Sequence, residues 1–82
     1  MTNIVIVEDD IFLREELQSI LQKEGYSVVS ISSFDTPVEE IIAANPALVV
    51  LDLNLPNLSG FQICRTLKEK GIGPILILTA RD

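Results

Sequence analysis

Four short apolar runs are spaced along the chain, at residues 3–7, 27–31, 48–53 and 75–78. The run at 48–53 is the most apolar. It is too short for a buried helix and has no polar alternation, which is typical of a central parallel strand covered on both faces. The run at 3–7 is β-branched and ends abruptly in three acids, as expected where a buried strand meets solvent. The pattern therefore predicts four β-strands.

Amphipathic stretches separate these runs, and the first covers residues 11–24. Its apolar side chains recur at helical spacing: Leu13, Leu17, Ile20 and Leu21. The acids that precede it suit a helix N-terminus, where negative charge is favourable, and Gly25 suits the helix end. We therefore expect an amphipathic helix between the first two strands.

Two further helices are predicted from their end signals. Thr36, Pro37 and Glu39 combine an N-cap, a proline at the first helical position and the acid of a capping box. The buried stripe of this second helix is predicted to be Val38, Ile41 and Ile42. It should end before residues 45–46, because the residue before a proline is pushed out of helical geometry. After a loop at 54–58, Ser59 and Gln62 predict a second capping box and a helix that runs to residue 70.

The predicted elements alternate as strand, helix, strand, helix, strand, helix, strand. Right-handed crossovers place such helices on both faces of one sheet, so the predicted fold is α/β with a doubly wound parallel sheet. A chain of 82 residues fits one domain and no second domain. The pattern stops soon after the fourth strand, before another helix could cover it. We therefore expect residues 1–82 to be a partial domain, truncated after that strand.

Composition and charge narrow the classes of function. The net charge is −6, and the six Lys and Arg residues are scattered along the chain. This argues against direct nucleic-acid contact, because binding to phosphates depends on clustered cations. Histidine is absent, which excludes a His general base, a His zinc ligand and a phosphohistidine on this chain. Any chemistry must rest on carboxylates and hydroxyls.

Cysteine usage and hydropathy bear on the compartment. The single cysteine, Cys64, cannot form a disulfide within the chain and falls in an apolar helical stripe, so a buried structural thiol is expected. The N-terminal residues lack the basic and long apolar regions of a signal peptide, and no apolar run is long enough to span a bilayer. A soluble, cytoplasmic protein without membrane contact is predicted.

Polar residues lie at the carboxyl ends of three of the predicted strands: Glu8 and Asp9, Asp52, and Thr79. In open parallel sheets the functional crevice lies beyond the carboxyl ends of the strands, so these side chains should share one edge. Crowded carboxylates repel each other, and a hard divalent cation reverses that repulsion. The sequence therefore predicts a Mg²⁺ site formed by Glu8, Asp9 and Asp52, to which Asn54 could add its main-chain carbonyl.

Asp52 is the best candidate for a reacting group. It ends an apolar strand, where a charge is costly unless coordinated or hydrogen-bonded, and aspartate can act as a nucleophile that forms an aspartyl-phosphate. Two plainer interpretations stay open. The acids at 8–10 could be only a solvated helix start, and Asp52 only a strand-terminal cap.

The residues around the fourth strand end admit the same two kinds of interpretation. Thr79 could bind a phosphoryl oxygen or merely satisfy main-chain groups, and the small Ala80 would let its N–H approach an anion. Gly60 and Pro56 are interpreted as turn and cap residues of the scaffold.

Three segments together resemble the receiver domain of two-component response regulators: residues 4–10 (IVIVEDD), 51–56 (LDLNLP) with 59–60 (SG), and 77–80 (ILTA). The resemblance spans essentially the whole chain and implies a flavodoxin-like fold. It implies that Asp52 accepts a phosphoryl group, that Glu8 and Asp9 bind Mg²⁺, that Asn54 offers a carbonyl ligand and that Thr79 is a switch hydroxyl.

The resemblance also implies partners. A sensor histidine kinase would be the phosphodonor, and the domain would act as a switch with self-phosphorylation and dephosphorylation chemistry rather than as a metabolic enzyme. The Glu-Asp-Asp start and the Leu-Thr-Ala-Arg ending look most like receivers attached to winged-helix DNA-binding domains, so transcription regulation is expected of a full-length protein.

The chain also departs from the family pattern. The lysine that contacts the phosphoryl group, a fifth strand and two further helices are missing from these 82 residues. The fourth strand would then be an unprotected apolar edge, which predicts self-association into a homo-oligomer. A binding or assembly module on the same fold, without phosphotransfer, is the alternative function.

Overall fold

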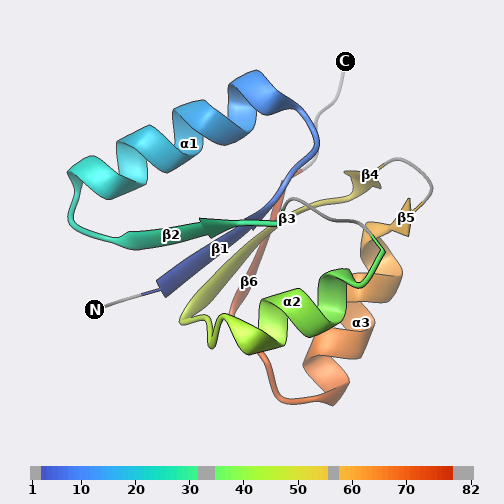
Figure 1. Cartoon of the computed structure of the whole chain (residues 1–82). Helices are drawn as coiled ribbons and strands as arrows, with labels where there is room; N and C mark the ends of the chain where they lie inside the picture. The colour runs from blue at the N-terminus through green and yellow to red at the C-terminus, as the bar shows by residue number, and fades with distance from the viewer. Residues whose placement is uncertain (1–2, 32–34, 56–57, 79–82) are drawn as a thin grey trace.

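A computed structural model of the chain describes residues 3–31, 35–55 and 58–78. Four parallel strands form one sheet in the order β2-β1-β3-β6, as Figure 1 shows. Their bounds are β1 Asn3–Val7, β2 Ser27–Ser30, β3 Leu48–Asp52 and β6 Ile75–Leu78. Helix α1 covers one face of the sheet, and α2 and α3 cover the other. The predicted doubly wound α/β fold is confirmed.

The helices are α1 Ile11–Lys23, α2 Pro37–Ala43 and α3 Gly60–Glu69. Asp10 is the N-cap of α1, and its Oδ1 accepts a hydrogen bond from the Leu13 N–H at 3.2 Å. Ser59 is the N-cap of α3, and its Oγ accepts from the Gln62 N–H at 3.3 Å. At α2 the predicted cap is wrong, because the Thr36 side chain makes no capping hydrogen bond and the proline that follows it supplies the helix start instead.

Side chains that alternate along the strands form two cores, one on each face of the sheet. The face under α2 and α3 holds the larger cluster, which consists of Val5, Val7, Ile31, Ile41, Val49, Leu51, Leu55, Ile63 and Leu67. The face under α1 holds the smaller cluster, whose buried members are Ile4, Ile6 and Val50. The two central strands, β1 and β3, are therefore buried on both faces.

The predicted helix stripes are only partly buried. In α1, Leu17 and Leu21 pack on the sheet, whereas Leu13 and Ile20 are exposed. In α2, Ile41 is buried, but Ile42 is exposed. The reason is that α1 lies over β1 and β2 without a neighbouring helix on that face among the described residues, so the flanks of its stripe stay in solvent.

Residues 54–58 were predicted to form a loop, and the structure corrects this in part. Two-residue strands β4 (Asn54–Leu55) and β5 (Leu58–Ser59) pair in antiparallel fashion, with Asn54 opposite Ser59. This small ribbon leads directly from the end of β3 into α3, beside the carboxyl end of the sheet (Figure 1).

Strand β6 forms one edge of the sheet, where it pairs only with β3 among the described residues. Its side chains Leu76 and Ile77 are exposed, although β3 beside it is almost completely buried. Cys64, predicted to be buried, is only half-buried on α3, where it packs against the larger core cluster. No helix in the described part of the chain is long and apolar enough to cross a membrane.

Candidate metal centre

Three carboxylates meet at the carboxyl end of the two central strands. Val7 of β1 lies opposite Leu51 of β3, so Glu8, the first residue after β1, lies beside Asp52, the last residue of β3. One carboxylate oxygen from each of Glu8, Asp9 and Asp52 can be chosen so that all three lie within 4.8 Å of one another. The structure therefore brings the three acids together, as the order of the strands predicts.

Burial differs within this acidic cluster, which we define as Glu8, Asp9 and Asp52. Glu8 is 2% exposed and Asp52 is 3% exposed, whereas Asp9 is open to solvent. Side chains along β1 point alternately to the two faces of the sheet, and this explains why Glu8 is buried and Asp9 is exposed. Ile4 and Ile6 face the core under α1, so Glu8 continues that buried face while Asp9 turns away from it. Two of the three acids are thus held where water is scarce.

One oxygen of the Glu8 carboxylate accepts a hydrogen bond, and the other accepts none. Its Oε2 accepts a hydrogen bond from the Asp10 N–H at 3.0 Å. Its Oε1 is fully buried and has no hydrogen-bond partner in the structure. A buried oxygen without a partner is unfavourable, because it has lost its hydration without replacement. The site therefore calls for a proton or a cation at this oxygen.

Burial raises the pKa of Glu8 from its ordinary value of 4.5 to about 7. Desolvation is the largest cause, and the Asp10 N–H opposes it by stabilising the charged form. The close carboxyl group of Asp52 and then that of Asp9 raise the pKa further. Near neutral pH, Glu8 is consequently poised between holding a proton and exchanging it for a cation.

The donor set of the acidic cluster fits Mg²⁺. Magnesium is a hard cation that binds carboxylate oxygens and keeps several waters, which suits one exposed and two buried acids at the rim of a sheet. The partnerless Oε1 of Glu8 supplies a position that a cation would satisfy. Asp52, Glu8 and Asp9 are therefore the residues that would hold the ion.

Gly60 contributes to the site in a way that the sequence interpretation missed. A Cβ atom at this position would lie 2.6 Å from the Cα of Leu53, the residue after Asp52. It would also lie 2.7 Å from the main-chain oxygen of Asp52. The first turn of α3 can therefore approach the end of β3 only because residue 60 has no side chain. The sequence did contain a signal for this close approach: a glycine stands directly after the N-cap, at a helical position where helix-forming residues are favoured.

The other predicted site residues have different outcomes. Asn54 lies in β4, two residues beyond Asp52 and at the same end of the sheet. Its main-chain carbonyl stays a predicted ligand. Thr79 and Ala80 lie outside the described residues, so their predicted roles at the phosphoryl group stay predictions.

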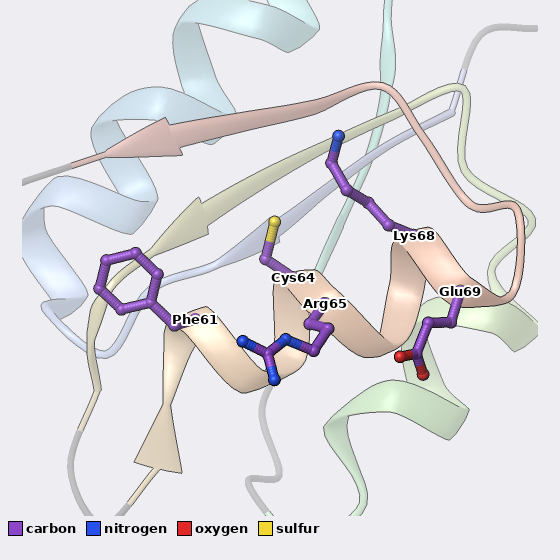
Figure 2. A pocket seen from close by; sticks show the side chains of 5 residues that line it. All are labelled: Phe61, Cys64, Arg65, Lys68 and Glu69. Atoms are coloured by element: carbon purple, nitrogen blue, oxygen red, sulfur yellow. The ribbon is translucent and has the colours of Figure 1, made fainter.

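A hollow of about 500 Å³ lies elsewhere, along α3. Figure 2 shows its lining side chains, Phe61, Cys64, Arg65, Lys68 and Glu69, projecting from that helix. None of them belongs to the acidic cluster. The hollow lacks crowded carboxylates and buried polar atoms, so it offers no comparable chemistry.

Comparison with known proteins gives the same picture for the whole chain. Residues 4–82 match the model of the response regulator receiver domain. The sensory transduction protein BceR of Halalkalibacterium halodurans is 35% identical over all 82 residues. The alkaline phosphatase synthesis transcriptional regulatory protein SphR of Synechococcus elongatus is 37% identical over 99% of the chain. The chain spans about a third of these relatives, 36% and 35% of their lengths.

Solved structures agree with the fold. The BeF₃-activated receiver domain of Klebsiella pneumoniae RstA superposes with a TM-score of 0.89 at 37% identity, over 99% of this chain and 69% of that one. The response regulator TrrA of Thermotoga maritima, in complex with Mg²⁺-BeF, superposes with a TM-score of 0.87 at 31% identity, over 100% and 72%. TrrA has also been solved in complex with the histidine kinase ThkA, with a TM-score of 0.83.

The raised pKa of Glu8 predicts a specific dependence of stability on pH. A carboxyl group with a folded-state pKa of about 7 favours folding fully below its ordinary pKa of 4.5, and this contribution is lost as the pH rises from 4.5 to 7. The loss is on the order of 3 kcal/mol, from about 1.4 kcal/mol per pKa unit. Glu8→Gln cannot ionise, so in EDTA it should gain stability relative to the wild type over this interval.

Urea unfolding of both proteins at several pH values measures this difference. Comparing the pair removes the acid sensitivity that both share. Mg²⁺ should reduce the difference at pH 7.5, because the cation stabilises the ionised Glu8 of the wild type. A difference in unfolding free energy that is constant between pH 4.5 and 7.5 would contradict the burial argument.

Proposed function

Because this chain belongs to the response regulator receiver domain family, we propose that Asp52 accepts a phosphoryl group at a Mg²⁺ site formed with Glu8 and Asp9. The observation that carries the proposal is the acidic cluster itself, with two buried acids and one exposed acid within reach of a single ion. The open Oε1 of Glu8 supports it, since that oxygen lacks any other partner. The Mg²⁺-BeF complex of TrrA supports the choice of ion.

The proposed reaction joins a carboxylate oxygen of Asp52 to phosphorus while the bond from phosphorus to the donor's leaving atom breaks. The Mg²⁺ that Glu8, Asp9 and Asp52 would hold would supply positive charge to the phosphoryl oxygens. The protein contributes positioning. The rigid end of β3 aims the Asp52 carboxylate, and Gly60 lets α3 pack against that strand end from behind. Water attack on the acyl phosphate returns Asp52 and releases inorganic phosphate.

We further propose that Thr79 and Ala80 act on the phosphoryl group, through the hydroxyl and the main-chain N–H respectively, and that Asn54 offers its carbonyl to the ion. The chemistry would serve a switch, with self-phosphorylation and dephosphorylation but no metabolic turnover. In a longer protein the readout would be regulation of transcription in the cytoplasm through a separate DNA-binding domain. The printed description of SphR as a transcriptional regulatory protein supports this.

A sensor histidine kinase is the proposed phosphodonor, and the rim of the site suits a protein partner. Ile11 and Phe12, in the first turn of α1 directly after the acidic loop, are 56% and 86% exposed. Exposed apolar side chains beside a reactive site are typical of a surface that a partner covers. The ThkA–TrrA complex provides a precedent within the family. Family membership disfavours the alternative of a binding module without phosphotransfer.

The central test is phosphorylation of Asp52. Incubation with Mg²⁺ and acetyl phosphate should add the mass of one phosphoryl group to the wild type and none to Asp52→Asn, because the nucleophile is gone. Asp10→Asn is the matched control: it removes a neighbouring carboxylate yet preserves the N-cap of α1. A phosphoryl group that persists in Asp52→Asn, or no response of the wild type even to beryllofluoride by NMR, would refute the proposal.

The role of the rim is tested separately. Phe12→Ser should slow phosphotransfer from a histidine kinase by about tenfold, the effect of losing one moderate interface anchor. Phosphorylation by acetyl phosphate should stay unchanged, since Phe12 lies outside the acidic cluster. Phe61→Ser is the control, because Phe61 is 71% exposed and belongs to α3, which covers the opposite face of the sheet. Equal slowing by both variants, or by neither, would argue against a kinase surface at α1.

The edge of β6 generates a prediction about assembly. We propose that β6 pairs with a second copy, since its Leu76 and Ile77 are exposed and no strand of the described residues pairs with its outer edge. Light scattering after size exclusion should show a mass that rises with concentration, and Leu76→Lys should shift it to the monomer. Ile20→Lys is the matched control, because both residues are 53% exposed. A wild-type monomer across the concentration range would sink this idea.

A further inference from the structure

Arg14 links helix α1 to the acidic cluster. It is the fourth residue of α1 and is half-buried, and its Nη1 donates a hydrogen bond to the main-chain oxygen of Glu8 at 3.2 Å. Helical side chains lean toward the helix N-terminus, so a long residue one turn into α1 reaches back over the loop that precedes it. The guanidinium is therefore placed at the connection between β1 and α1.

This hydrogen bond acts on one peptide unit of the cluster. The oxygen of Glu8 belongs to the planar peptide that joins Glu8 to Asp9, so fixing it fixes the direction in which the chain enters Asp9. Asp9 is exposed and belongs to neither core cluster. The direction of its main chain therefore depends on the loop around it.

The other bonds of the loop complete the frame. The Asp10 N–H holds the Glu8 carboxylate at 3.0 Å, and the Arg14 N–H donates to the Asp10 oxygen at 2.9 Å. Arg14 thus contacts the loop with both its main chain and its side chain. It is also the residue that places a permanent positive charge here; the other described basic residues lie at the end of α1, on α3 or just beyond it: Lys23, Arg65, Lys68 and Lys70.

We propose that Arg14 is a positioning residue for the Mg²⁺ site, which it serves by holding the Glu8–Asp9 peptide and not by touching the ion or the phosphoryl group. The inference rests on the proposed function, because it assumes that the acidic cluster binds Mg²⁺. Residues that orient metal ligands are typically worth about 10-fold or more in metal affinity. We therefore expect an effect of Arg14 on Mg²⁺ affinity of about this size.

The test is a Mg²⁺ titration followed by the backbone amide shifts of residues 8–10 and by calorimetry. Arg14→Met keeps the apolar stem but removes the charge and the donors, and it should weaken Mg²⁺ binding by about 10-fold. Arg14→Lys should fall between the wild type and Arg14→Met, since it restores charge without the rigid fork. Lys23→Met makes the same change in net charge at the far end of α1 and should bind like the wild type.

A double-mutant cycle with Asp9→Asn separates positioning from simple charge. If Arg14 acts through the placement of Asp9, Arg14→Met should have little further effect on Mg²⁺ affinity in the Asp9→Asn protein. An undiminished effect there, or Mg²⁺ binding by Arg14→Met within about twofold of the wild type, would overturn the inference. A merely structural role would lower the midpoint of urea unfolding without changing Mg²⁺ affinity. A wild type that binds no Mg²⁺ would instead overturn the proposed function itself.

Discussion

The structure depends on placing two carboxylates, those of Glu8 and Asp52, together where they are almost fully buried. The carboxyl group of Asp52 helps to raise the pKa of Glu8, and two buried like charges destabilise the folded state when both ionise. The chain meets this demand through register: β1 and β3 pair so that Val7 faces Leu51, and the acids follow at the strand ends. The repulsion is thus imposed by the most tightly packed part of the molecule, and the two central strands cannot shift to relieve it.

Other features around the acids compensate for this repulsion or maintain its geometry. The Asp10 N–H stabilises the charged form of Glu8 and partly opposes the rise in its pKa. Gly60 lets α3 approach the main chain of Asp52 more closely than any side chain would permit. Arg14 holds the peptide between the two acids that follow β1. Each of these is a main-chain contact, so the site is defined mainly by backbone placement and only secondarily by side-chain packing.

Much of this was predictable from the sequence, for physical reasons. Apolar runs with abrupt polar ends fixed the bounds of β1 and β6, and parallel pairing then required Glu8 and Asp52 to share an edge. Even the burial of Glu8 rather than Asp9 follows from alternation along β1. What failed depended on neighbours in space. The Thr36 side chain makes no capping hydrogen bond, Leu13 and Ile20 are exposed, and residues 54–55 pair with residues 58–59. No local pattern reveals whether a second helix lies alongside, or that a carbonyl six residues away will meet Arg14.

The same rigidity suggests how a charge change at Asp52 would be transmitted. On the proposed function, phosphorylation alters the charge at the end of β3, and core clusters on both faces hold the two central strands, β1 and β3, in place. These two strands can move little when the charge at Asp52 changes. The structural response must therefore occur in the segments at the carboxyl edge of the sheet. In the described part of the chain those are the loop after β1, which Arg14 anchors, and the β4–β5 ribbon. The first is held by several hydrogen bonds and the second by strand pairing, while the edge strand β6 has exposed side chains on both faces. The response should therefore be greatest on the β6 side, because β6 pairs with one strand among the described residues and its side chains are the less buried ones.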